Sequence, residues 1–121
     1  MKVLVDTSIW VDHLRRPEPG VIRLIAVGDL LMHPGVRGEL VVGNLPARRE
    51  MLVALRNLPL LAASEWESVF AFIESNRLYG RGLSWVDTQL LCAVGQARHQ
   101  LWTRDVALRQ AAETLGLAWV P

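Results

Sequence analysis

The sequence predicts an α/β domain in which a parallel sheet lies between two layers of helices. Short apolar runs alternate with longer stretches of helical periodicity, which is typical of this class. The 121 residues fit one compact domain over 1–121, and no repeat, linker or low-complexity segment divides them. Because 51% of the residues are apolar, the chain can bury a substantial core.

The first half of the chain predicts two strands and four helices. Lys2–Val5 and Asp29–His33 are short apolar runs of the kind found in buried strands. Helices are predicted over Ile9–Leu14 with Thr7 or Ser8 as cap, over Val21–Ile25 up to Gly28, over Pro34–Leu45 and over Ala47–Asn57.

The second half contains two matches to the capping-box pattern, in which a hydroxyl residue precedes an acid by three positions. Ser64 and Glu67 predict a helix that runs to about Leu78, and Ser84 and Asp87 predict one that runs to about Gln100. The remaining elements are expected to be a strand at Leu101–Trp102, a helix over Val106–Leu115 and a last strand over Leu117–Val120.

Composition excludes several classes of protein. The 13 basic and 12 acidic residues give a net charge of +1, which is unlike a purely electrostatic nucleic-acid binder. Cys92 is the one cysteine, so a disulfide framework is excluded and a reducing cytoplasm is the expected setting. The first apolar run ends at Asp6, too early for a signal peptide, and no apolar run is long enough to span a membrane.

Four acids are predicted to meet at one edge of the sheet. In open parallel sheets, sites form beyond the carboxyl ends of the strands. Asp6 ends the first strand, and Asp105 follows the strand Leu101–Trp102. Glu39 lies one to two turns into the helix after the second strand. Asp87 lies in the first turn of the helix that leads to the strand Leu101–Trp102, and such a helix starts at the carboxyl edge because it runs antiparallel to the strand that it precedes. All four side chains therefore project toward the carboxyl edge.

Each acid also has a structural interpretation that needs no ligand. Asp6, Asp87 and Asp105 stand where helix-capping residues stand, and for Asp87 and Asp105 taken alone capping is favoured. Glu39 differs because its neighbours Val36 and Leu40 suggest burial, and an unpaired buried glutamate is costly. We therefore expect Glu39 to have a partner, such as a cation.

Gathered carboxylates predict a divalent-metal site. Acids crowded at one edge repel one another, which raises their pKa values unless a cation binds. Oxygen ligands without a histidine or cysteine cluster suit Mg²⁺ or Mn²⁺ better than Zn²⁺. Such ions hydrolyse phosphodiesters by activating water and stabilising charge on the phosphoryl oxygens.

Four sequence blocks resemble the PIN-domain ribonucleases of the VapC toxin type. The first is Val3–Arg15, VLVDTSIWVDHLR, and it is followed by Glu39-Leu40 with Gly43. The third is Leu83–Asp87 with Leu90, Leu91 and Ala93, and the fourth is Leu101–Asp105 with Leu108. The blocks occur in the family's order and spacing, and the resemblance covers nearly the whole chain.

The resemblance implies a three-layer α/β/α fold and an endoribonuclease that depends on Mg²⁺ or Mn²⁺. It implies that Asp6, Glu39, Asp87 and Asp105 are catalytic, with Asp6, Asp87 and Asp105 as the metal ligands. It also implies a VapB-type antitoxin and a homodimer. Many relatives carry a further acid shortly after the fourth, where this chain has Val106 and Ala107, so only one tightly held metal is expected.

Four residues beside the acids are candidates for substrate binding. The family's hydroxyl next to the first acid maps onto Thr7 or Ser8, and the hydroxyl of the fourth block maps onto Thr103. For Arg104 the sequence leaves two roles open, namely contact with a substrate phosphate and ion pairing with the carboxylate cluster.

Two other functions compete with the ribonuclease. One is a catalytically silent PIN-like module that binds RNA or a protein, against which the presence of all four acids argues. The other is an aspartyl-phosphate enzyme with Asp6 as nucleophile. A phosphatase of this kind needs a second acid two residues after the nucleophile, but Ser8 stands at that position. A phosphate receiver would lack its usual lysine, because Lys2 is the only lysine in the chain.

Overall fold

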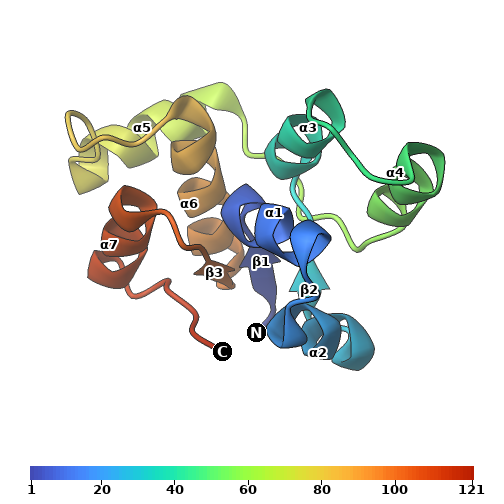
Figure 1. Cartoon of the computed structure of the whole chain (residues 1–121). Helices are drawn as coiled ribbons and strands as arrows, with labels where there is room; N and C mark the ends of the chain where they lie inside the picture. Colours follow the sequence, from blue (N-terminus) through green and yellow to red (C-terminus); the bar gives the residue numbers. More distant parts are fainter.

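A computed structural model describes all residues, 1–121, and contains a three-stranded parallel sheet (Figure 1). The strands are β1 (Val3–Val5), β2 (Leu30–Leu31) and β3 (Gln100–Trp102) in the order β2-β1-β3. Val3 pairs with Leu30 on one side and Gln100 on the other, so β1 is the central strand. The predicted parallel sheet is confirmed.

Seven helices surround the sheet: α1 (Thr7–Arg15), α2 (Pro19–Val27), α3 (Pro34–Val42), α4 (Arg48–Arg56), α5 (Trp66–Asn76), α6 (Trp85–Ala97) and α7 (Val106–Thr114). The connection from β1 to β2 and the connection from β2 to β3 move along the sheet in opposite directions. Because such crossovers are right-handed, their helices cover opposite faces. This places α1 and α2 on one face and α6 on the other, as in a three-layer α/β/α fold.

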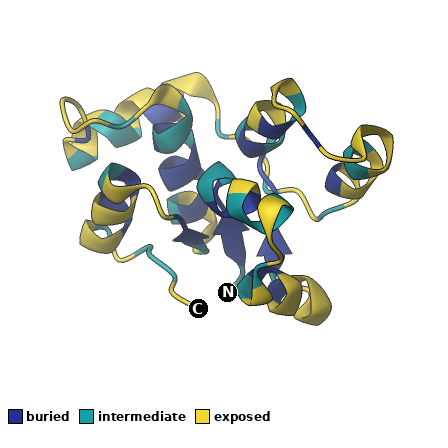
Figure 2. Ribbon diagram, in the orientation of Figure 1, coloured by how far each residue is buried: buried dark blue, intermediate teal, exposed yellow.

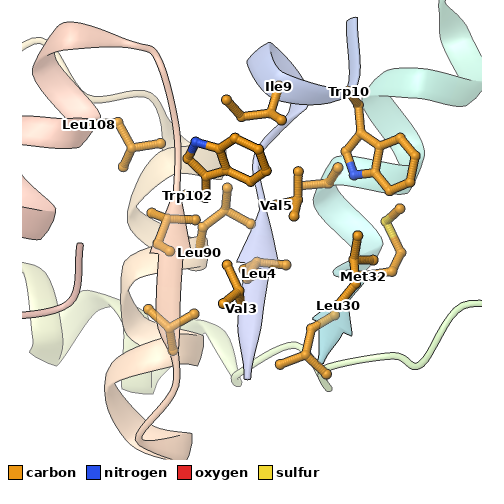
Figure 3. Close-up of a cluster of buried hydrophobic side chains, with 14 of the residues drawn as sticks. Val3, Leu4, Val5, Ile9, Trp10, Leu30, Met32, Leu90, Trp102 and Leu108 are labelled. Carbon is orange, nitrogen blue, oxygen red and sulfur yellow. The ribbon is translucent and has the colours of Figure 1, made fainter. Parts of the chain in front are cut away.

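The core lies between the sheet and these helices (Figures 2 and 3). All three β1 residues are buried, and Trp102 of β3 packs edge-on against Trp119 at a ring-centroid distance of 5.0 Å. The helix α6 buries a continuous run of residues, Leu90–Val94. Cys92 belongs to this run and is fully buried as a small apolar residue.

Several element boundaries differ from the sequence predictions. The helix α1 begins at Thr7, so neither Thr7 nor Ser8 is its cap. The third helix ends at Val42 and not at Leu45, because Gly43 adopts an extended conformation. Gly28 ends α2 in a left-handed conformation with φ of 76°, as expected for a glycine after a helix.

Two predictions for the second half of the chain are wrong. The helix α5 starts at Trp66 with no side-chain cap, and the Ser64 hydroxyl instead donates to Gln96 Oε1 at 2.9 Å. The last predicted strand is reduced to one isolated bridge between Leu101 and Ala118. None of the helices combines the length and the apolar character needed to cross a membrane.

Candidate active site

Asp6 lies where the central strand meets α1, and two hydroxyl groups hold its carboxylate. Its Oδ2 atom accepts hydrogen bonds from Thr103 Oγ1 at 2.7 Å and from Ser8 Oγ at 2.9 Å. Although Asp6 occupies the cap position of α1, its side chain does not cap that helix. The residue is only 6% exposed, and its Oδ1 atom accepts no hydrogen bond within the protein. The structure thus orients a buried carboxylate with one free oxygen.

Asp87 and Asp105 both cap the helices that they precede or begin. Asp87 Oδ2 accepts from the Ser84 backbone N–H at 2.9 Å, and Ser84 Oγ accepts from the Asp87 N–H at 3.0 Å, so the predicted capping box is confirmed. Asp105 Oδ2 accepts from the Leu108 N–H at 2.9 Å. In each aspartate the other carboxylate oxygen makes no hydrogen bond within the protein.

Asp6 and Asp105 lie near enough to Asp87 for their charges to act on its carboxyl group. The pKa of the Asp87 carboxyl is raised, chiefly by its burial and additionally by the charges of Asp6 and Asp105, against the lowering effect of the Ser84 hydrogen bonds. The fold therefore brings together residues from the end of β1, the start of α6 and the start of α7. This local repulsion is the kind that a cation relieves.

Glu39 occupies a different environment from the one its neighbours suggested. It is exposed on α3, so the expectation that it is buried is wrong. Its Oε1 atom accepts a hydrogen bond from Thr7 Oγ1 at 2.8 Å, which ties it to the residue beside Asp6. Its partner in the structure is therefore a hydroxyl group, and its Oε2 atom remains free.

Ser8 and Thr103 form a small hydroxyl network that joins the first and fourth sequence blocks. Their oxygen atoms are 3.3 Å apart, and both donate to Asp6. Ser8 Oγ also accepts from the Arg104 backbone N–H at 3.1 Å, and Thr103 Oγ1 accepts from the Asp105 N–H at 3.0 Å. The two hydroxyls thereby connect the Asp6 carboxylate to the loop between β3 and α7.

Arg104 pairs with two acids outside the four candidate catalytic residues. Its Nη1 atom lies 2.6 Å from Asp12 Oδ2, and its Nη2 atom lies 2.5 Å from Glu18 Oε2. These contacts raise the pKa of Arg104 and lower that of Glu18. No local pattern reveals this arrangement, because Asp12 and Glu18 are 92 and 86 residues away from Arg104.

A cavity of about 380 Å³ adjoins Thr7 and Glu39. It lies between α1 and α3 and is closed by the loop that follows Gly43. Arg48 fixes this loop by donating to the Val41 carbonyl at 2.7 Å and to the Gly43 carbonyl at 3.2 Å. The candidate site therefore opens on one side into a formed hollow.

The donor set fits a hard divalent cation in its chemistry. Three aspartates each present a carboxylate oxygen without a hydrogen-bond partner at the same sheet edge, and such oxygen donors suit Mg²⁺ or Mn²⁺. In this structure no three acidic, histidine or cysteine side chains lie close enough together to hold an ion.

Comparison with known proteins assigns the chain to a family. No family model matches the sequence. Ribonuclease VapC32 of Mycobacterium tuberculosis strain CDC 1551 / Oshkosh is 38% identical over 119 residues, covering 96% of this chain and 94% of the relative. The protein of the same name from strain ATCC 25618 / H37Rv matches equally well. This chain belongs to the VapC family of ribonucleases.

The fold of this VapC-type chain also occurs in a solved structure, that of FitAB bound to the IR36 DNA fragment. The TM-score is 0.64, and the match covers 92% of this chain and 90% of the other. At 18% sequence identity this likeness concerns the fold alone. It confirms the predicted PIN-like α/β architecture.

Proposed function

We propose that this VapC-type chain is an endoribonuclease that acts as the toxin of a toxin–antitoxin pair and depends on Mg²⁺ or Mn²⁺. The observation that carries the proposal is the convergence of Asp6, Asp87 and Asp105, each with one free carboxylate oxygen, at the carboxyl edge of the sheet. The proposal is supported by the 38% sequence identity to Ribonuclease VapC32, which extends over 96% of this chain.

In this proposal Asp6, Asp87 and Asp105 would hold the metal ion. Such an ion, when bound, would activate water and stabilise the charge that develops on the phosphoryl oxygens. Thr103 and Ser8 keep the buried Asp6 carboxylate in one orientation, since both donate to its Oδ2 atom. Preorganised ligands of this kind avoid reorganisation during the reaction.

Glu39 acts at the open side of the site. Its contact with Thr7 at 2.8 Å holds one oxygen, and its exposure leaves the other accessible to substrate or to a proton. A carboxylate in this position is suited to orienting or deprotonating an attacking water molecule. We therefore keep Glu39 as a catalytic residue that does not bind the metal directly.

The partners proposed for the chain follow from its family. Its substrate is RNA, its inhibitor is a VapB-type antitoxin, and it assembles as a homodimer. Thr7, Ser8 and Thr103 are the hydroxyl residues proposed to contact the RNA backbone. Ser8 and Thr103 also orient the Asp6 carboxylate, and Thr7 holds Glu39.

The deciding experiment compares the wild type with Asp6→Asn. Purified proteins are incubated with total RNA and Mg²⁺ or Mn²⁺, and the cleavage sites are mapped. We expect cleavage by the wild type and none by Asp6→Asn, while near-UV circular dichroism shows that both are folded. Asp29→Asn is the matched control, because Asp29 precedes β2 at the opposite edge of the sheet.

Two results would contradict the proposal. If Asp6→Asn cut RNA as fast as the wild type, the assignment of the site would be wrong. If the wild type cut no RNA and calorimetry detected no binding of Mn²⁺, the chain would be the catalytically silent binding module.

A further inference from the structure

The Arg104 side chain pairs with two acids on neighbouring helices. Its guanidinium contacts Asp12 on α1 at 2.6 Å and Glu18 at the start of α2 at 2.5 Å. Its Cζ atom lies 5.8 Å from the centre of the Trp102 ring, which supports it from below. The charges that raise the pKa of Arg104 come from Glu18 and Asp12 and from none of the four candidate catalytic acids.

The acids that hold Arg104 are themselves fixed. Glu18 caps α2, since its Oε1 atom accepts from the Gly20 N–H at 3.3 Å. Its backbone N–H donates to His13 Nδ1 at 2.9 Å, which joins it to the last turn of α1. Arg104 is therefore clamped to the place where α1 ends and α2 begins.

The main chain of Arg104 points the other way, into the candidate active site. Its N–H donates to Ser8 Oγ at 3.1 Å, and Ser8 Oγ donates to Asp6 Oδ2 at 2.9 Å. The preceding residue, Thr103, donates to the same Asp6 oxygen, and the following residue, Asp105, is itself a candidate ligand. The position of residue 104 thus sets three of the groups that surround Asp6.

Stability alone does not account for this arrangement. Exposed ion pairs contribute little to the free energy of folding, and the Arg104 side chain is 41% exposed. A planar guanidinium that bridges two acids nevertheless restricts geometry strongly, because both hydrogen bonds must be satisfied together. The consequence of the clamp is therefore the placement of the loop over residues 103–105.

We propose that Arg104 is a positioning residue for the Asp6 site, acting through Asp12 and Glu18, and is not a ligand of the RNA phosphates. The inference rests on the proposed ribonuclease function and names the residues that keep its site in order. It replaces the two roles that the sequence left open, because the guanidinium is held by Asp12 and Glu18 and by none of the four candidate catalytic acids.

The first test is Arg104→Gln. We expect kcat for RNA cleavage to fall about tenfold, the lower end of the effect seen when groups that orient metal ligands are removed. KM, RNA affinity measured by fluorescence anisotropy, and its salt dependence should remain those of the wild type. A residue that binds phosphate would behave differently. Its loss would weaken RNA binding and lower the slope of log affinity against log salt concentration by about one.

The second test removes the clamp and keeps the arginine. In the double variant Asp12→Asn, Glu18→Gln the guanidinium is released. The control with the same change of charge is the double variant Glu50→Gln, Glu74→Gln, which neutralises two exposed acids on α4 and α5. If Arg104 is a positioning residue, kcat falls as in Arg104→Gln and RNA affinity equals that of this control. If Arg104 binds phosphate, the released side chain gives a higher RNA affinity than the control, and the inference is overturned.

Arg104→Lys, a conservative variant, and Arg109→Gln, a matched control, complete the series. Lysine retains the charge but cannot bridge both acids in a plane, so Arg104→Lys should recover only part of kcat. Arg109 pairs with Glu113 at 3.3 Å on the exposed face of α7, and Arg109→Gln should leave kcat unchanged. Equal losses in Arg109→Gln and Arg104→Gln would show a nonspecific charge effect and overturn the inference.

A readout without RNA separates this inference from the proposed function. Calorimetric Mn²⁺ affinity of the free protein should be weaker in Arg104→Gln than in the wild type, with folding verified by near-UV circular dichroism. A wild type that cleaves RNA and an Arg104→Gln protein with unchanged kcat and Mn²⁺ affinity would refute the positioning role alone. A wild type that neither cleaves RNA nor binds Mn²⁺ would refute the proposed function as well.

Discussion

His33 makes the stability of the fold depend on pH. It lies after β2 and caps α3, because its Nδ1 atom accepts a hydrogen bond from the Gly35 N–H at 2.9 Å. This bond requires the unprotonated Nδ1, so the proton of the neutral ring is on Nε2, which is buried without a partner. Burial lowers the pKa of His33 from 6.5 to about 4. Protonation would abolish the cap and bury a charge.

The size of the effect follows from that shift. Because the pKa is lower in the folded protein than in the unfolded chain, the contribution to stability is complete above about pH 6.5 and is lost as the pH falls toward 4. Each unit of difference is worth about 1.4 kcal/mol. Between pH 7 and pH 5 the free energy of unfolding should therefore fall by about 2 kcal/mol on account of this residue.

The assay is urea denaturation of the wild type and of His33→Asn at both pH values. Asparagine keeps an oxygen that can cap α3 but does not titrate, so the pH-dependent loss should shrink by about 2 kcal/mol in the variant. A uniform destabilisation at both pH values is expected from the smaller side chain and does not affect this difference. The pKa of His13 is also lowered by burial, but both proteins retain that residue. An equal loss of stability in wild type and variant would refute the reasoning.

Two further predictions concern folding. Ser84→Ala removes the acceptor of the Asp87 N–H and should lower the free energy of unfolding by about 1 kcal/mol in urea denaturation; an unchanged value would mean that the capping box does not stabilise α6. Gly20→Ala places a methyl group 2.6 Å from the buried Trp102 ring and should cost about 1–3 kcal/mol, whereas Gly38→Ala, where an added Cβ meets nothing, should be neutral or stabilising. Equal effects of the two alanines on the thermal midpoint would exclude the steric explanation.

Local patterns were sufficient for the sheet and for most helices. The strand β1 and the helix α6 were predictable because a β-branched run and a capping box are each contained within a few residues. Ser64 and Glu67 match the same box, yet Ser64 has a partner on another helix, Gln96, and the box does not form. A short motif is thus reliable only where no long-range partner competes for its hydroxyl.

The wrong expectation for Glu39 has a similar cause. Apolar neighbours in the sequence suggest burial, but successive residues of a helix point in different directions. On α3 Leu40 is buried and Val42 is 86% exposed, so Glu39 lies on the open side of an apolar segment. The ion pairs of Arg104 with Asp12 and Glu18 could not be predicted from the sequence either, because they depend on how α1, α2 and the loop after β3 meet in space.

For Asp87 and Asp105 the sequence offers helix capping and metal binding as alternatives, but in the structure each side chain can do both at once. In both residues one oxygen, Oδ2, is engaged by a backbone N–H, and the other is free. Asp6 shows the same division, with hydroxyl donors in place of the backbone. A carboxylate anchored through one oxygen loses little side-chain freedom when the other binds a cation, so capping favours binding by lowering its entropic cost. The caps therefore support metal binding by Asp87 and Asp105, because they hold these two carboxylates in place.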